Sequence, residues 1–206
     1  MGRSSKITVS FRHRLVKLIA PKLFADWLLF SGKDTVDCER PMISFLKSYF
    51  GDKPLVGCEV GVREGINALR ILKTLNIERL YLIDPYLPYY EPLFPETSSF
   101  AYQEKQMLEA QKLLGAYSNK IVWLRQTSDE AVKEIGGSLD FCYLDADHKY
   151  SQMKLDVKNY LQLISKEGVV GGHDFNSGYF GLCTAVLECF SWSKLQGKGF
   201  DWWAIK

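Results

Sequence analysis

The chain has 206 residues, of which 47% are hydrophobic and 14% are aromatic. This length supports one sizeable hydrophobic core and is short for two independent domains. The 26 Lys and Arg residues nearly balance the 24 Asp and Glu residues, for a formal net charge of +2. A dedicated nucleic-acid binder usually carries a strong positive excess, so no nucleic-acid partner is expected.

The cysteine pattern and the lengths of the apolar runs bear on the cellular compartment. The five cysteines contain no CxxC pair, and Cys58 and Cys142 lie within apolar, strand-like runs. Free thiols in such runs behave as small hydrophobic residues, which favours a reducing, cytoplasmic environment. No stretch approaches the roughly 18 uninterrupted apolar residues of a membrane span. The sequence therefore predicts neither a transmembrane segment nor a signal peptide.

Residues 1–50 form a basic N-terminal extension with helical patterns. Before Asp26 the chain carries six Lys and Arg residues and no acid. Apolar positions recur at helical spacing between 11 and 30, and Pro21 interrupts them, which predicts two short amphipathic helices. A third helix is expected after Pro41. Three roles remain open for this extension: a helical cap over the sheet edge or the active site, a homodimer contact, or a basic surface that binds anionic lipid weakly.

Residues 51–206 are expected to form one α/β domain, because their pattern alternates between strands and helices. Apolar runs predict strands at 55–60, 79–84, 120–125, 139–145 and 167–174. Helical patterns occupy 64–75, 101–114, a short stretch after Ser128, 151–164 and 179–190. The final segment, FDWWAIK, is expected to add a last strand. Strands interleaved with helices predict right-handed crossovers and a parallel sheet of the α/β class.

One long irregular segment interrupts this alternation. Residues 85–100, PYLPYYEPLFPETSSF, contain four prolines and many aromatic residues. Proline lacks a backbone N–H and fixes φ, so this composition disfavours a regular helix or strand. Long irregular segments are often lids over active sites. We therefore predict a lid that begins after the second strand.

Polar residues and glycines gather where the predicted strands end. In strand order they are Glu59, Gly61 and Gly65; Asp84; Thr127 and Ser128; Asp145, Asp147 and His148; and His173 with Asp174. Ligands of open parallel α/β sheets bind at the carboxyl ends of the strands, beside helix N-termini. The sequence therefore predicts a ligand site along this edge.

The first strand is followed by CEVGVREG, which has the form ExGxxxG. The GxGxxG of a dinucleotide-binding turn is absent, because Arg63 and Glu64 occupy its middle. An acid at Glu59 suits a cationic ligand better than a pyrophosphate. Asp84 ends the second strand, where a carboxylate accepts hydrogen bonds from both hydroxyls of a ribose. The alternative for the glycines is a purely structural turn between strand and helix.

Five segments in order, EVGVREG, LIDPY, QTSDEAV, YLDADHKY and GVVGGHDF, resemble the class I S-adenosylmethionine-dependent methyltransferases. More narrowly, the DxDHxY and GGHD motifs are similar to methyltransferase family 24. The resemblance covers about residues 54–175, with WWAIK as a candidate last strand. It implies a Rossmann-like, doubly wound sheet of seven strands that is mostly parallel, with an antiparallel last strand.

The resemblance also implies roles for individual residues. Glu59, Gly61 and Gly65 would border the amino-acid end of S-adenosylmethionine, and Glu59 would face its amino group. Asp84 would bind the ribose hydroxyls, and Thr127 and Ser128 would lie beside the adenine. Asp145 would stand at the end of the fourth strand, facing both the methyl donor and the acceptor.

Two chemical routes would relieve an acceptor hydroxyl of its proton. In the first, His148 or His173 is a general base beside Asp145, because imidazole titrates near neutral pH. In the second, Asp145, His173 and Asp174 bind Mg²⁺ or Mn²⁺, as in related metal-dependent O-methyltransferases. Those relatives carry an acid where this sequence has His173, and a nitrogen ligand favours a softer ion than Mg²⁺.

Structural roles are alternatives for the same residues. Asp147 could cap the following helix, His148 could pack against Tyr150, and the His173–Asp174 pair could stabilise its loop. Among functions, we expect O-methylation of a small hydroxylated molecule, such as a sugar or another metabolite. The alternatives are an NAD(P)-dependent oxidoreductase and a non-catalytic binding module.

Overall fold

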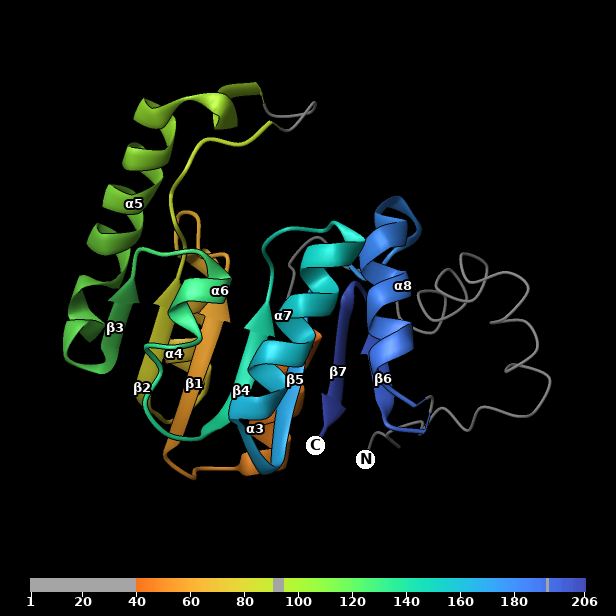
Figure 1. Ribbon diagram of the computed structural model, residues 1–206. Helices are drawn as coiled ribbons and strands as arrows, with labels where there is room; N and C mark the ends of the chain where they lie inside the picture. The colour runs from red at the N-terminus through yellow and green to blue at the C-terminus, as the bar shows by residue number, and fades with distance from the viewer. Residues whose placement is uncertain (1–39, 91–94, 192) are drawn as a thin grey trace.

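The computed structural model describes residues 40–90, 95–191 and 193–206. The two helices predicted between 11 and 30 lie outside the described residues. A single seven-stranded sheet has the order β3-β2-β1-β4-β5-β7-β6. In Figure 1 the sheet runs across the molecule with helices in front of it and behind it.

The strands have the predicted order along the chain, with one addition. They are β1 (Leu55–Val60), β2 (Ile77–Ile83), β3 (Ile121–Leu124), β4 (Leu139–Leu144), β5 (Ile164–Gly172), β6 (Leu195–Lys198) and β7 (Asp201–Ile205). Strands β1 to β5 pair in parallel, and β7 pairs antiparallel with both β5 and β6. The Rossmann-like sheet with an antiparallel last strand is thus confirmed. Strand β6 was not predicted, because its sequence LQGK has only one strongly apolar residue.

The helices also follow the predicted alternation. They are α3 (Pro41–Phe50), α4 (Ile66–Thr74), α5 (Phe100–Leu114), α6 (Ser128–Ala131), α7 (Tyr150–Leu163) and α8 (Phe180–Cys189). Short 3-10 helices span Pro95–Ser98, Gly115–Lys120 and Ser177–Tyr179. Within the described ranges, every helix is too short or too polar to cross a bilayer.

Both faces of the sheet are covered, which explains the continuous apolar runs. In β4, Phe141 and Tyr143 point to one hydrophobic cluster, while Cys142 and Leu144 point to the other. The first cluster includes side chains of α3, α4 and the end of α5, and the second includes side chains of α6, α7 and α8. Figure 1 shows α6, α7 and α8 on the near face and α3 and α4 on the far face.

Helix α3 shares the core of the sheet although the sequence placed it in the N-terminal extension. Its buried residues Met42, Ile43 and Leu46 join the same cluster as Val169 of β5 and Trp203 of β7. Burial of such side chains contributes roughly 1.5–3 kcal/mol each. The described part of the extension is therefore integral to the fold.

The segment after β2 leaves the sheet at the carboxyl ends of the strands, rises above them in Figure 1 and returns through α5. Tyr86 is buried, and its hydroxyl donates to the carbonyl of Arg63 at 2.9 Å. Tyr89 and Thr97 are joined by two hydrogen bonds, at 3.1 and 2.9 Å. Residues 91–94 lie outside the described ranges, and a lid role for this segment stays a prediction.

Candidate active site

The loop between β1 and α4 contains two glycines with left-handed backbone. Gly61 has φ of 89°, and a Cβ at this position would collide with the backbone carbonyl of Asp145. Gly65 has φ of 78° and is the N-cap residue of α4, where a Cβ would press against Ala110 and Leu114 of α5. Only glycine adopts such φ values without strain. The fold itself therefore requires glycine at both positions. Gly61 also brings the ends of β1 and β4 into direct contact.

Asp84 holds this loop from the end of β2. Its Oδ2 accepts the backbone N–H groups of Val62 and Arg63, both at 3.0 Å, and its Oδ1 accepts the N–H of Tyr86 at 2.8 Å. A carboxylate has about four acceptor positions, so capacity remains for a ligand hydroxyl. The structure thus places Asp84 beside the glycine loop, and its ribose contact stays a prediction.

Glu59 is a buried acid beneath the same loop, with 1% of its surface exposed. Its Oε1 accepts a hydrogen bond from Asn67 at 2.9 Å, whereas Oε2 has no hydrogen-bond partner among the described residues. Burial raises the pKa of Glu59 to about 8, and the nearby charge of Asp145 adds to the effect. A buried acid with one orphaned oxygen is suited to a cationic ligand.

Thr127 and Ser128 follow β3 at the start of α6. Thr127 forms a capping box with Glu130, and its hydroxyl lies 2.8 Å from the Glu130 carboxylate. The Ser128 hydroxyl donates to the buried Asp156 at 2.6 Å. Both hydroxyls thus bind protein groups, and contact of these residues with adenine stays a prediction.

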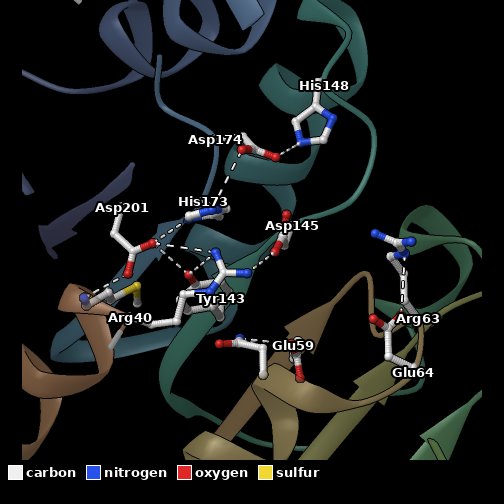
Figure 2. Close-up of polar contacts among 12 residues, drawn as sticks. Arg40, Glu59, Arg63, Glu64, Tyr143, Asp145, His148, His173, Asp174 and Asp201 are labelled. Carbon is white, nitrogen blue, oxygen red and sulfur yellow. Dashed lines mark hydrogen bonds and ion pairs between the residues drawn. The ribbon is translucent and has the colours of Figure 1, made fainter. Parts of the chain in front are cut away.

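Two carboxylates and one imidazole meet at the ends of β4 and β5. One ligand atom each from Asp145, His148 and Asp174 lies within 4.8 Å of the others. His148 Nε2 is 3.0 Å from Asp174 Oδ2, a contact that Figure 2 marks with a dashed line. The His148 ring stacks on Tyr179, with 4.2 Å between ring centroids. His148 therefore packs on Tyr179 rather than on Tyr150, which was the packing partner considered from the sequence.

His173 lies next to this cluster, but its ring turns to a different partner. Its Nδ1 is 2.7 Å from Oδ1 of Asp201, the first residue of β7. Its Nε2 is 3.7 Å from Asp174 Oδ1, which is beyond hydrogen-bonding distance. The sequence predicted that Asp145, His173 and Asp174 converge, whereas the structure brings His148 to Asp145 and Asp174. His173 is replaced because Asp201 holds its ring.

Three residues that sequence reasoning missed complete the polar network. Arg40 places its guanidinium 3.5 Å from Asp145 Oδ2, 3.4 Å from the Tyr143 hydroxyl and 3.9 Å from Asp201 Oδ1. In Figure 2 it lies between the two aspartates. The available signal was a single acid, Asp201, within the apolar run FDWWAIK. Arg40 carried no comparable signal, because it precedes a proline in an ordinary helix start.

The network shifts the ionisation of its members. Burial raises the pKa of Asp145, and the charge of Arg40 opposes that effect. Burial alone would lower the pKa of His148 and raise that of Asp174, but their close contact and opposite charges outweigh it. The pKa of His148 is therefore raised and that of Asp174 is lowered. Both shifts favour an ion pair of imidazolium and carboxylate.

The sequence matches a known family over the part of the chain that builds these loops. The model of the methyltransferase domain family matches residues 58–175, more than half of the 206 residues. The chain belongs to this methyltransferase family. The enzyme is accordingly an S-adenosylmethionine-dependent methyltransferase of class I. The family match argues against the two alternative functions considered from the sequence, an NAD(P)-dependent oxidoreductase and a non-catalytic binding module. No curated protein matches the chain significantly in sequence.

Solved structures share this fold at low sequence identity. SMU.1697c from Streptococcus mutans, in complex with SAH, has a TM-score of 0.56 and 11% identity, over 82% of this chain and 97% of its own. An rRNA methylase from Streptococcus thermophilus has a TM-score of 0.53 and 10% identity, over 84% and 97%. The N-methyltransferase NodS from Bradyrhizobium japonicum WM9 has a TM-score of 0.50 and 16% identity, over 84% and 97%. These likenesses support the fold of the methyltransferase.

Proposed function

We propose that this methyltransferase methylates a hydroxyl oxygen of a small, uncharged molecule, with His173 as general base. The observation that carries the proposal is His173 at the carboxyl end of β5, held through Nδ1 by Asp201 and adjacent to Asp145, His148 and Asp174. A hydroxyl must lose its proton as it attacks, whereas a neutral amine attacks through its own lone pair. An imidazole with one nitrogen turned to the site is therefore most useful for an oxygen acceptor.

The residues around β1 and β2 fit the methyl donor. S-adenosylmethionine supplies an electrophilic methyl group on a sulfonium sulfur. The orphaned Oε2 of Glu59 belongs to a buried acid that would ionise beside the donor's ammonium. Asp84 would accept a ribose hydroxyl at its remaining acceptor position while it holds the loop backbone. Asp145, at the end of β4, would lie between the donor and the acceptor.

The charge of the site favours an uncharged acceptor over a nucleic acid. The three acids Asp145, Asp174 and Asp201 outnumber Arg40 and His148, even when His148 carries a proton. A phosphate backbone would meet this acidic surplus and lose affinity through like-charge repulsion. We therefore propose a sugar-like or other hydroxylated metabolite as the acceptor.

A panel of acceptors tests this function directly. Release of S-adenosylhomocysteine would be followed with neutral polyols, sugars and phenols, with amines of matched shape, and with an rRNA transcript. We expect turnover with a hydroxylated compound and none with the amines or the RNA. Turnover confined to amines or to RNA would contradict the proposal.

A divalent cation is a second route to the same chemistry. Asp145, His148 and Asp174 offer two oxygen ligands and one nitrogen ligand within 4.8 Å. This mixed set fits Mn²⁺ better than Mg²⁺, which prefers oxygen ligands alone. Bound there, a cation would lower the pKa of the acceptor hydroxyl and orient it.

Replacement of Asp174 by asparagine should therefore weaken Mn²⁺ binding by about tenfold or more, since one of three ligands loses its charge. Electron paramagnetic resonance of Mn²⁺ titrations would measure the loss. Asp147→Asn is the matched control, because Asp147 pairs with Lys149 and is absent from the trio. Equal Mn²⁺ binding by the wild type and the Asp174 variant would rule out this cation site.

Donor binding should release a proton from Glu59. The pKa of about 8 keeps Glu59 mostly protonated at neutral pH, and a bound ammonium would favour its ionised form. Calorimetry of S-adenosylhomocysteine binding in buffers of different ionisation heats should show proton release near pH 7. Glu59→Gln should bind without that release.

The same shift predicts how the stability of the ligand-free protein depends on pH. The folded-state pKa lies above the ordinary value of 4.5. The folded protein therefore retains a proton that the unfolded chain has lost, and this group reduces stability as pH rises from about 4.5 to about 8. Glu59→Gln should lack this contribution in denaturant titrations. A slope identical to that of the wild type would contradict the assignment.

We also propose a cytoplasmic location. Cys58, Cys142 and Cys189 are free thiols. Unpaired thiols are typical of reducing compartments. The homodimer contact and the weak contact of the basic N-terminus with anionic lipid stay predictions.

A further inference from the structure

Asp201 is a buried acid outside the family match, and it connects three elements of the fold. Its exposed fraction is 1%. Oδ2 accepts the backbone N–H of Met42 at 2.9 Å, near the start of α3. Oδ1 accepts the hydroxyl of Tyr143 at 2.8 Å and lies 2.7 Å from His173 Nδ1. An acid so deeply buried is costly unless its partners are all in place.

We propose that Asp201 is a positioning residue that fixes the ring orientation and the tautomer of His173. The proposal rests on the proposed function for the chemistry of His173. It assigns a role in the reaction to the last strand, which the family match does not reach.

The hydrogen-bond pattern determines the tautomer. An ionised carboxylate only accepts hydrogen bonds, so His173 Nδ1 must carry the proton that joins it to Asp201. In the neutral ring Nε2 then bears the lone pair. Nε2 lies 3.7 Å from Asp174 Oδ1, so that acid leaves its lone pair available to an acceptor hydroxyl. Without Asp201 the ring would be free to rotate or to take the other tautomer.

Arg40 and Tyr143 support the charge of Asp201. The guanidinium of Arg40 lies 3.9 Å from Oδ1, and the Tyr143 hydroxyl donates to the same oxygen. Figure 2 shows dashed lines from the Asp201 carboxylate to His173, Arg40 and Tyr143, which gather on the same side of it. Arg40, like Asp201, lies outside residues 58–175. The groups that hold the general base His173 thus come from both sides of the family match, Arg40 before it and Asp201 after it.

The substitution Asp201→Asn tests this role with almost no change in shape. The N–H of Met42 still needs an acceptor, so the asparagine oxygen should stay on Met42 and the amide NH₂ should face His173. An NH₂ group donates, so Nδ1 would have to accept and the proton would move to Nε2. In serine–histidine–aspartate triads the same exchange gives the wrong tautomer and a loss of about 10⁴-fold in kcat.

Nuclear magnetic resonance of ¹⁵N-histidine protein reads the tautomer without any acceptor. The chain has three histidines, so His148→Gln and His173→Gln suffice to assign the spectrum. We expect an Nδ1–H tautomer for His173 in the wild type and an Nε2–H tautomer in Asp201→Asn. Tyr143→Phe, which leaves the contact between Asp201 and His173 in place, should keep the wild-type tautomer. An Nε2–H tautomer in the wild type would overturn the proposal even if the variant failed to fold.

Kinetics with an acceptor from the panel give a second readout. Asp201→Asn should lower kcat by about 10²-fold or more, with little change in KM or in S-adenosylhomocysteine affinity. In the background of His173→Gln the same substitution should add no further loss, because Asp201 acts through His173. Additive losses would overturn the positioning role. An amine acceptor combined with the expected tautomers would instead contradict the proposed function and leave the positioning intact.

Discussion

His173→Gln is expected to lower the turnover number by roughly 10²- to 10⁴-fold, which is the usual contribution of a general base. Glutamine approximates the size of the ring and its NH₂ can still bond to Asp201, so the loop should keep its shape. Affinity for S-adenosylhomocysteine should be nearly unchanged, because His173 lies at the end of β5 and Glu59 and Asp84 lie around β1 and β2. Steady-state kinetics and calorimetry would separate the two quantities.

His148→Gln is the informative comparison. Its ring is bound to Asp174 and stacked on Tyr179, so it is not free to take a proton from the acceptor. A larger loss in His148→Gln than in His173→Gln would transfer the role of base to His148. Full activity in both variants would show that the acceptor is activated by other groups.

Gly61→Ala is expected to destabilise the protein by roughly 2–5 kcal/mol, which combines a strained positive φ with the displacement of a packed neighbour. The added methyl group would collide with the Asp145 carbonyl, and φ is 89°. Because the loop and the end of β4 would have to separate, binding of S-adenosylhomocysteine should also be lost. Urea titrations would measure the stability, and calorimetry the binding.

Gly115→Ala is the matched control for this substitution. Gly115 has φ of −54°, and nothing lies within 4 Å of the position of its Cβ. Alanine in an unstrained helical position is neutral or mildly stabilising, by up to about 1 kcal/mol. Equal stability of the two variants would show that the contact between Gly61 and Asp145 is dispensable.

Most of the fold followed from the sequence because buried parallel strands are continuous apolar runs. LVGCEV and LDFCYL have this character and became β1 and β4. The run LQGK does not, and it is a strand because β7 pairs with it along its whole length. The role of α3 was also missed, because the pattern of one helix says nothing about which surface it covers.

The site was predictable to the level of strand ends, but its pairings were not. The carboxyl ends of β4 and β5 bring Asp145, His148, His173 and Asp174 together by topology alone. The orientation of each ring depends on partners that are distant in sequence. His173 turns toward Asp201 and His148 stacks on Tyr179, 28 and 31 residues away. Such contacts follow from side-chain packing across elements, which periodicity and motif spacing do not encode.

The pairing of β7 with β5 also protects the protein from aggregation. Without the last two strands, β5 would be an exposed edge of nine residues, with unpaired backbone groups that recruit other chains. In the complete sheet the two outermost strands are β3 and β6, and each has only four residues. Short edges offer few backbone groups for intermolecular pairing. A fragment trimmed to residues 58–175 would therefore be prone to associate through β5.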